Sequence, residues 1–182
     1  MHAEIVIAGF GGQGALFAGQ MLAYAAMDAG QHVTWIPSYG PEMRGGTAHC
    51  TVIISDDEIG SPLVAHPSAV IAMNQPSLDK YGPLVAPGGL LIHSALPGAI
   101  PPACPGLRRI EIPANAIADE LGSPQAANMV LVGALLAATQ ILPLATVEAA
   151  LVAHLPERHR NVLEANRQAL RQGAALAAAL PL

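Results

Sequence analysis

Short apolar runs and longer helical segments alternate along the chain, and glycine or proline residues separate most of them. Runs rich in β-branched residues predict strands, because these side chains favour extended backbone. Segments rich in Ala, Leu and Met predict helices. The predicted strands are residues 4–8, 32–36, 47–55, 69–73, 90–93 and 107–112. The predicted helices are residues 15–29, 77–85, 114–121, 125–140, 146–155 and 157–180.

The order of these elements indicates the fold class. Strands interleaved with helices, followed by helices alone, favour an α/β fold with a single open, mainly parallel sheet flanked by helices and a helical C-terminal region. The face of the last helix that is expected to be buried contains Val162, Leu163, Ala169, Leu170, Leu176 and Leu180. The sequence shows no internal repeat or interdomain linker, so residues 1–182 are predicted to form a single domain.

The composition predicts a surface with few charges. Apolar residues make up 52% of the chain, but aromatic residues only 3% and charged residues only 12%. Charged residues usually account for about a quarter of a soluble domain. We therefore expect part of the surface to be covered by another chain, in a heterooligomer or a homodimer. An alanine-rich composition without any covered surface is the alternative.

Charge and cysteine content exclude several kinds of site. The net charge is −5, and the few basic residues form no cluster that could follow a nucleic-acid backbone, so no nucleic acid is expected as a partner. Cys50 and Cys104 lie far apart and belong to no C-x-x-C pair, so local spacing builds neither an iron–sulfur cluster nor a zinc site. Both cysteines are expected to be reduced, partly buried thiols of a cytoplasmic protein.

One segment, residues 126–145, is largely apolar and about long enough to span a membrane. Asn128, Gln140 and Pro143 interrupt it, so we predict a buried helix followed by a turn and no association with a membrane. The N-terminus has no basic residues before its first apolar run, so no signal peptide is predicted.

A glycine-rich segment, Gly9–Gly14, connects the first predicted strand to the first predicted helix. It matches G-x-G-x-x-G, in which glycines let main-chain N–H groups approach a phosphate at a helix N-terminus. A dinucleotide site also needs an acidic residue at the end of the second strand, and residues 35–38 supply none. The segment is therefore predicted to bind an anion or a partner rather than NAD. Glycines that serve only helix–strand packing are the alternative.

A second glycine-rich segment, Ser38–Gly46, reads Ser-Tyr-Gly-Pro-Glu-Met-Arg-Gly-Gly and is predicted to be a sharply turned loop. Arg44 is the only Arg or Lys among the first 79 residues. A single guanidinium between glycines, at the carboxyl end of a parallel strand, suits a phosphate, a carboxylate or the acidic side chain of a partner. The alternative is an internal ion pair between Glu42 and Arg44.

The two segments together closely resemble those of the gamma subunit of 2-oxoacid:ferredoxin oxidoreductases. The resemblance continues at Val52–Ser55 with Ile59 and Pro62, at Gly88–Ile92 and at Asn128–Ala134, and it covers essentially the whole chain. It implies membership of a complex that oxidatively decarboxylates a 2-oxo acid to its acyl-CoA and passes the electrons to ferredoxin. The isolated chain is expected to be inactive.

The resemblance also implies the cofactors and partners. Thiamine diphosphate, Mg²⁺ and iron–sulfur clusters are expected in the complex but not in this chain alone. The implied partners are alpha and beta subunits, a ferredoxin-like delta subunit, ferredoxin and coenzyme A. No catalytic residue or metal ligand is assigned to this chain.

The residues that the resemblance implies for the coenzyme A site lie in both segments. In the first segment, main-chain donors are expected at Gly11, Gly12, Gln13 and Gly14. The second segment contributes Ser38, Tyr39, Gly40, Glu42, Arg44, Gly45 and Gly46. Arg44 would supply charge for an anionic group of coenzyme A or for a contact with the catalytic subunits. Two alternative functions remain, a stand-alone nucleotide- or phosphate-binding α/β module and the small subunit of indolepyruvate oxidoreductase, which shares these segments.

Overall fold

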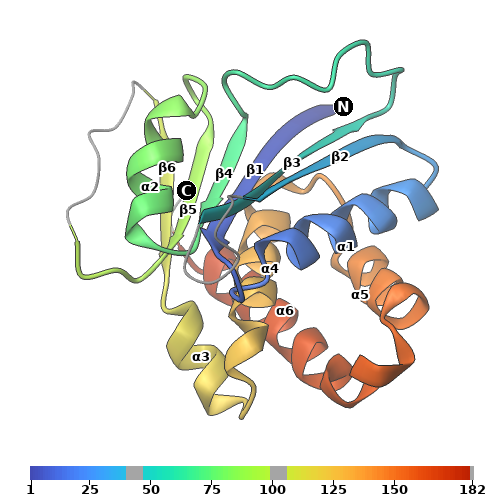
Figure 1. Cartoon of the computed structure of the whole chain (residues 1–182), viewed down its shortest axis with the longest axis vertical. Coiled ribbons are helices and arrows are strands. Elements are labelled where there is room, and N and C mark those ends of the chain that lie inside the picture. The colour runs from blue at the N-terminus through green and yellow to red at the C-terminus, as the bar shows by residue number, and fades with distance from the viewer. Residues whose placement is uncertain (40–46, 99–105, 181–182) are drawn as a thin grey trace.

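The computed structural model contains a six-stranded sheet in the order β2-β3-β1-β4-β5-β6 (Figure 1). It describes residues 1–39, 47–98 and 106–180. The strands are β1 (His2–Phe10), β2 (His32–Tyr39), β3 (Thr47–Ser55), β4 (Ala69–Ala72), β5 (Leu90–Ser94) and β6 (Arg108–Ile112). The α-helices are α1 (Ala15–Asp28), α2 (Gln75–Tyr81), α3 (Ala114–Glu120), α4 (Ala127–Thr139), α5 (Leu144–His154) and α6 (Leu163–Ala178). Short 3₁₀ turns lie at Gly82–Leu84, Pro124–Ala126 and Glu157–Val162.

The direction of the strands confirms the predicted mainly parallel sheet, with one exception. β1, β4, β5 and β6 are parallel neighbours, whereas β3 is antiparallel to both β1 and β2. The connection from β2 to β3, residues 40–46, is shorter than the dozen or so residues that a parallel crossover needs, so β3 returns antiparallel. β2 therefore points the same way as β1, and both strands end at the same edge of the sheet.

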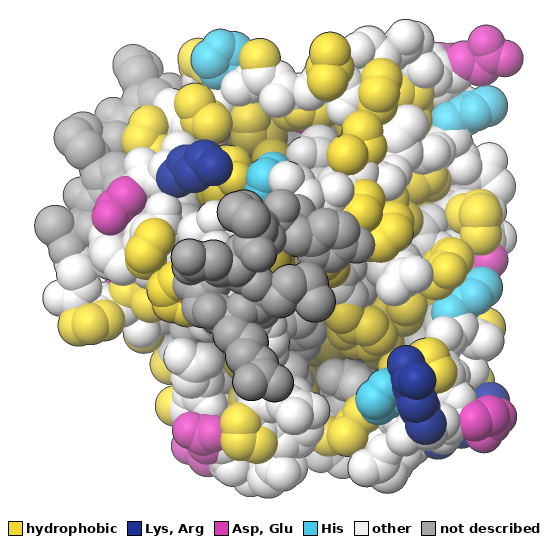
Figure 2. All heavy atoms as spheres, viewed as in Figure 1, with side chains coloured by type: hydrophobic (Ala, Val, Ile, Leu, Met, Phe, Trp, Pro, Cys, Tyr) yellow, Lys and Arg dark blue, Asp and Glu magenta, His cyan; other side chains and the backbone are white. Residues whose placement is uncertain are grey.

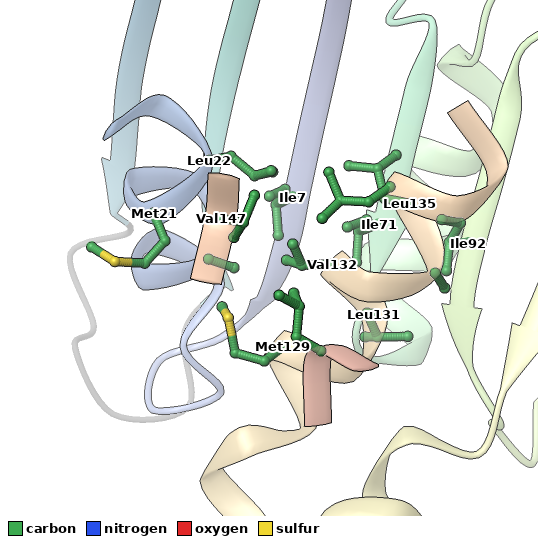
Figure 3. Close-up of a cluster of buried hydrophobic side chains, with 14 of the residues drawn as sticks. Ile7, Met21, Leu22, Ile71, Ile92, Met129, Leu131, Val132, Leu135 and Val147 are labelled. Carbon is green, nitrogen blue, oxygen red and sulfur yellow. The ribbon is translucent and has the colours of Figure 1, made fainter. Parts of the chain in front are cut away.

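Helices cover both faces of the sheet, as predicted, but unequally (Figure 1). The larger core cluster lies between the sheet and α1, α4, α5 and α6. In Figure 3, Ile7, Ile71 and Ile92 of three neighbouring parallel strands gather around Val132 and Leu135 of α4. The smaller cluster lies beneath α2 on the other face and is built by Val6, Ala8, Val70, Ala72, Leu78, Tyr81, Val85 and Leu91.

Helix α4 lies between the sheet and α6, and every residue from Asn128 to Leu136 is buried. Two glycines allow this close packing. A Cβ atom at Gly133 would overlap the carbonyl oxygen of Leu170, and one at Gly173 would overlap the carbonyl oxygen of Val130. Among the described residues, no helix is both long and apolar enough to cross a membrane, and the predicted buried helix is confirmed.

The C-terminal helix differs from the prediction. Residues Glu157–Val162 form a 3₁₀ turn, and α6 begins only at Leu163. The buried residues of α6 are Asn166, Ala169, Leu170, Gly173 and Ala177. The predicted burial of Leu176 and Leu180 was wrong, since these side chains are 42% and 41% exposed. The buried face is centred on Gly173, which has no side chain and gives no hydrophobic signal.

Two other predicted boundaries were also wrong. Ser38 and Tyr39 were expected to begin a loop, but they continue β2 because their backbones pair with β3. Helix α5 begins at Leu144 rather than at residue 146, directly after Pro143. The fixed φ of proline suits the start of a helix, which explains the earlier beginning.

Cys50 is a packing residue between β3 and α1. A Cβ atom at Gly19 would overlap its Sγ atom, so α1 approaches the sheet closely at this point. The Cys50 Sγ donates a hydrogen bond to the carbonyl oxygen of Ala15 at 3.4 Å. Burial raises the pKa of the Cys50 thiol to about 12, so the thiol stays protonated and unreactive at neutral pH. Cys104 lies outside the described residues.

Candidate functional site

The first glycine-rich segment lies at the carboxyl ends of the parallel strands, where open α/β sheets bind their ligands. β1 ends at Phe10 and α1 begins at Ala15, so residues 11–14 form the turn between them. Gly12 has a φ angle of 98° and Gly14 one of 78°, which residues with a Cβ atom rarely adopt. The turn itself therefore requires glycine at these two positions.

The side chain of Gln13 holds this turn closed. Its Oε1 accepts hydrogen bonds from the Phe10 N–H group at 2.7 Å and from Asn74 Nδ2 at 2.9 Å. Its Nε2 donates to the carbonyl oxygen of Met73 at 3.3 Å. The main-chain N–H group of Gln13 donates to the Phe10 carbonyl oxygen at 3.0 Å, so it is not free for a ligand as the sequence suggested. Gln13 instead positions the turn through contacts within the chain.

Asn128 of α4 fixes the other end of the turn. Its Nδ2 donates to the carbonyl oxygen of Gly14 at 3.1 Å, and its Oδ1 accepts from the Met129 N–H group at 2.7 Å. A Cβ atom at Gly14 would overlap this carboxamide. Gly14 is therefore needed for its φ angle and also for the close approach of Asn128.

The N-terminus of α1, which follows this turn, suits an anion. No side chain of the described residues caps the helix, and its first turn contains no acidic residue. The first N–H groups of an α-helix have no partner within the helix, and the helix dipole adds positive potential there. A phosphate or carboxylate group is therefore the preferred ligand at this position.

Two pockets flank the turn, and Gly12, Gln125 and Asn128 line both of them. The first pocket has a volume of about 230 Å³ and lies over the ends of β4 and β5, where Met73 and Ser94 line it. The second pocket has a volume of about 270 Å³ and lies on the side of α1 and α6. The shared residues make the two pockets adjoin at the turn.

Ser94 is the most unusual polar residue of the first pocket. Its side chain is 2% exposed, and its hydroxyl group has no hydrogen-bond partner in the described part of the chain. Buried hydroxyl groups in proteins nearly always have a partner, so this group is available to a ligand. Sequence reasoning missed Ser94, although its place at the end of a buried strand was a signal that could have found it.

The second pocket combines an apolar wall with a basic rim. Phe17 and Leu155 supply apolar surface, and Asn166 and His159 supply polar groups. Arg158 lies beside this pocket, because its Nε donates to His159 Nε2 at 3.1 Å. Figure 2 shows basic, histidine and acidic side chains at the lower right, over the connection between α5 and α6, where Glu157 pairs with Arg160. The rim therefore suits a negatively charged group.

The structure places only the beginning of the second glycine-rich segment. Gly9 of β1 and Tyr39 of β2 pair with the same residue of β3, Ala48, from opposite sides. The two segments therefore leave the same sheet edge about 10 Å apart, which is two strand spacings. The candidate residues outside the described residues are Gly40, Glu42, Arg44, Gly45 and Gly46.

The topology favours an anion or partner site over a dinucleotide site. In dinucleotide-binding folds, a parallel second strand lies beside the first and carries the acidic residue that binds the ribose. Here the strand between β1 and β2 is the antiparallel β3, whose carboxyl end lies at the opposite sheet edge. No acidic side chain can therefore reach the turn from that strand end.

Replacing Gln13 with alanine is expected to lower the free energy of unfolding by about 2 kcal/mol, because the Phe10 N–H group loses its side-chain acceptor. Urea unfolding of the purified chain measures this change. The control is Gln125→Ala, an exposed residue next to the same turn, which should change stability by less than about 0.5 kcal/mol. Equal losses in the two variants would contradict the positioning role of Gln13.

Comparisons with known proteins agree with the resemblance seen in the sequence. Residues 4–176 match the family model described as pyruvate ferredoxin/flavodoxin oxidoreductase. A ketoisovalerate oxidoreductase subunit of Methanothermobacter thermautotrophicus is 44% identical over 134 residues, which are 74% of this chain. The match spans only 28% of the length of that relative.

Two solved structures share the fold. The gamma subunit of a keto/oxoacid ferredoxin oxidoreductase from Geobacter sulfurreducens has a TM-score of 0.83 and 32% identity, over 98% of this chain and 99% of that one. A 2-oxoglutarate:ferredoxin oxidoreductase from Magnetococcus marinus, solved with 2-oxoglutarate, coenzyme A and succinyl-CoA bound, has a TM-score of 0.87 and 27% identity, over 99% of this chain and 32% of that one. The predicted family and fold class are confirmed, and the chain belongs to the pyruvate ferredoxin/flavodoxin oxidoreductase family.

Proposed function

We propose that this chain is the gamma subunit of a cytoplasmic complex that oxidatively decarboxylates a 2-oxo acid to its acyl-CoA, with electron transfer to ferredoxin. In this proposal the chain contributes the binding site for coenzyme A and does not carry out the oxidation. Thiamine diphosphate, Mg²⁺ and the iron–sulfur clusters belong to alpha and beta subunits and to a ferredoxin-like delta subunit.

The observation that carries the proposal is the turn at residues 11–14, which presents an uncapped helix N-terminus between two adjoining pockets. Coenzyme A is a long molecule with phosphate groups, so it needs an anion site and extended contacts on either side. Its presence in the structure of the Magnetococcus marinus relative supports this choice of ligand. Gly11, Gly12 and Gly14 are the proposed main-chain contacts.

The charge distribution supports a partner subunit. No charged residue occurs between Glu4 and Asp28, a stretch that includes most of β1, the whole turn and nearly all of α1. Met27 of α1 is 52% exposed, and apolar side chains dominate the face in Figure 2. Interface cores are depleted of charged residues, so this region suits contact with the catalytic subunits.

The choice of 2-oxo acid belongs, in this proposal, to the partner subunits that hold thiamine diphosphate. The relatives described above act on ketoisovalerate and on 2-oxoglutarate, so the shared fold of this domain does not set the substrate. Indolepyruvate is also a 2-oxo acid, so the alternative of an indolepyruvate oxidoreductase subunit stays open in this proposal. Activity assays of the complex with each 2-oxo acid distinguish these cases.

Replacing Arg44 with alanine is expected to raise the Michaelis constant for coenzyme A about tenfold, which corresponds to the loss of one charge-assisted contact. Binding of thiamine diphosphate should not change. Steady-state kinetics of the reconstituted complex measures both effects. Arg171→Ala is the control, because Arg171 pairs with Glu148 on the outer helices α5 and α6. An unchanged Michaelis constant in the Arg44 variant would refute its role at the coenzyme A site.

A further inference from the structure

The two pockets beside the turn differ in chemistry, and this difference indicates how a ligand lies across them. Of the described residues that line the first pocket, none is charged. The rim of the second pocket carries His159, which accepts a hydrogen bond from Arg158. One pocket therefore suits a neutral polar group, and the other suits an anionic group.

We propose that the two pockets divide coenzyme A between them. The first pocket binds the neutral pantetheine arm with its two amide groups, and the second binds the phosphorylated adenosine end. This inference rests on the proposed function, because it assumes that coenzyme A is the ligand. It adds the orientation of the ligand and the residues that recognise each part.

The free polar groups of the first pocket match an amide chain. The carboxamides of Gln13 and Asn128 are already used within the protein, as described above. The groups left for a ligand are the buried Ser94 hydroxyl and the carboxamides of Asn115 and Gln125. Hydroxyl and carboxamide groups both donate and accept hydrogen bonds, as the N–H and C=O groups of an amide require. A phosphate group would find no cationic side chain among the described lining residues.

The second pocket offers what the nucleotide end needs. Phe17 and Leu155 give apolar surface for a base, and the buried Asn166 gives a carboxamide that can recognise its polar edge. Arg158 supplies positive charge for phosphate groups at the rim, beside His159, which accepts a hydrogen bond from it. Between the pockets lie Gly12 and the N-terminus of α1, which suits the diphosphate in the middle of the molecule.

The size of the pockets agrees with a shared ligand. Cavities that bury a whole small ligand usually measure about 300–1,000 Å³. The two pockets measure about 230 and 270 Å³, so each is too small for a molecule as large as coenzyme A. Since Gly12, Gln125 and Asn128 line both, one ligand can pass from one pocket into the other along the surface of the turn.

Three probes and two variants of the purified complex test whether the two pockets bind different parts of coenzyme A. The probes are coenzyme A, pantetheine as a shortened acyl acceptor, and adenosine 3′,5′-bisphosphate as an inhibitor competing with coenzyme A. Ser94→Ala is expected to lower kcat/KM about fivefold for both coenzyme A and pantetheine, with the inhibition constant of the bisphosphate unchanged. Arg158→Ala is expected to raise the inhibition constant of the bisphosphate and the KM for coenzyme A about fivefold, with kcat/KM for pantetheine unchanged.

The opposite pattern would overturn the inference. One such result is that Ser94→Ala raises the inhibition constant of the bisphosphate as much as it lowers kcat/KM for pantetheine. Another is that it leaves kcat/KM for pantetheine unchanged. Either result would mean that the first pocket does not bind the amide arm. Thermal unfolding of the variant complexes checks that each is folded, and Ser94→Thr, which keeps the hydroxyl group, should retain more of the pantetheine activity than Ser94→Ala. Failure of the proposed function itself is distinguishable, because the unaltered complex would then form product without coenzyme A and would not be inhibited by the bisphosphate.

Discussion

Replacing Gly173 with alanine is expected to destabilise the chain by more than about 3 kcal/mol, although alanine is the better helix former. A Cβ atom at this position would overlap the carbonyl oxygen of Val130, so α4 and α6 would have to separate. Because α4 fills the space between α6 and the sheet, separation would also loosen the main core. A loss of this size is a large part of the total stability of a domain, which is about 5–15 kcal/mol.

Helix propensity and packing predict changes of opposite sign in the free energy of unfolding of the Gly173→Ala variant. The measurement therefore decides between them. Propensity alone predicts that Gly173→Ala stabilises the helix by about 1 kcal/mol. Urea unfolding of the purified chain gives the sign directly. The control is Ala175→Gly on the exposed side of α6, which should cost only about 1 kcal/mol. Stabilisation by Gly173→Ala would show that the two helix backbones do not touch at this point.

Replacing Gly12 with alanine in the complex is expected to raise the Michaelis constant for coenzyme A at least tenfold, or about 1.4 kcal/mol. Gly12 lines both pockets, and apart from its chain neighbours no described residue has an atom within 4 Å of a Cβ atom placed there. The added methyl group would therefore point into the space that the ligand is proposed to occupy. The φ angle of 98° adds strain that disfavours the bound form of the turn.

Gly30 provides a matched control for the Gly12 substitution. It has a φ angle of 82°, and a Cβ atom there also meets nothing within 4 Å. It lies at the other end of α1, about 20 Å away along the helix. Gly30→Ala should therefore cost a similar amount of stability but leave the Michaelis constant unchanged. Equal kinetic effects of the two substitutions would mean that Gly12 acts only through folding.

Local signals explain why most of the fold was predictable. Strands such as Thr47–Ser55 are rich in β-branched residues, and a glycine follows the end of α1. In both cases the local sequence preference matches the element that forms there. The two glycine-rich segments were recognisable because each combines several unusual residues within a short distance. The glycine turn before the N-terminus of α1, where we propose that an anion binds, also followed from local sequence, since it needs only a strand, a glycine-rich segment and a helix.

The features that the sequence did not reveal depend on contacts between distant residues. The close approach of α4 and α6 joins Gly133 to Leu170 and Gly173 to Val130, and an isolated glycine in a helix carries no signal for such a contact. Gln13 was expected to offer its main-chain N–H group to a ligand, but this group donates to the Phe10 carbonyl oxygen instead. The fold also brings Met73 and Asn74 beside the Gln13 side chain, and their hydrogen bonds with it fix the turn. The position of Ser94 at the end of a strand was visible in the sequence, but the lack of a partner for its buried hydroxyl group among the described residues is visible only in the structure.

Purification of the tagged chain from its own cells tests the central claim most directly. The account predicts that thiamine-diphosphate-binding alpha and beta subunits copurify in fixed stoichiometry, and that the preparation reduces ferredoxin only when a 2-oxo acid and coenzyme A are both present. Recovery of the chain alone or as a homodimer, with a nucleotide or phosphate bound and no thiamine-dependent activity, would contradict the account and favour a stand-alone binding module.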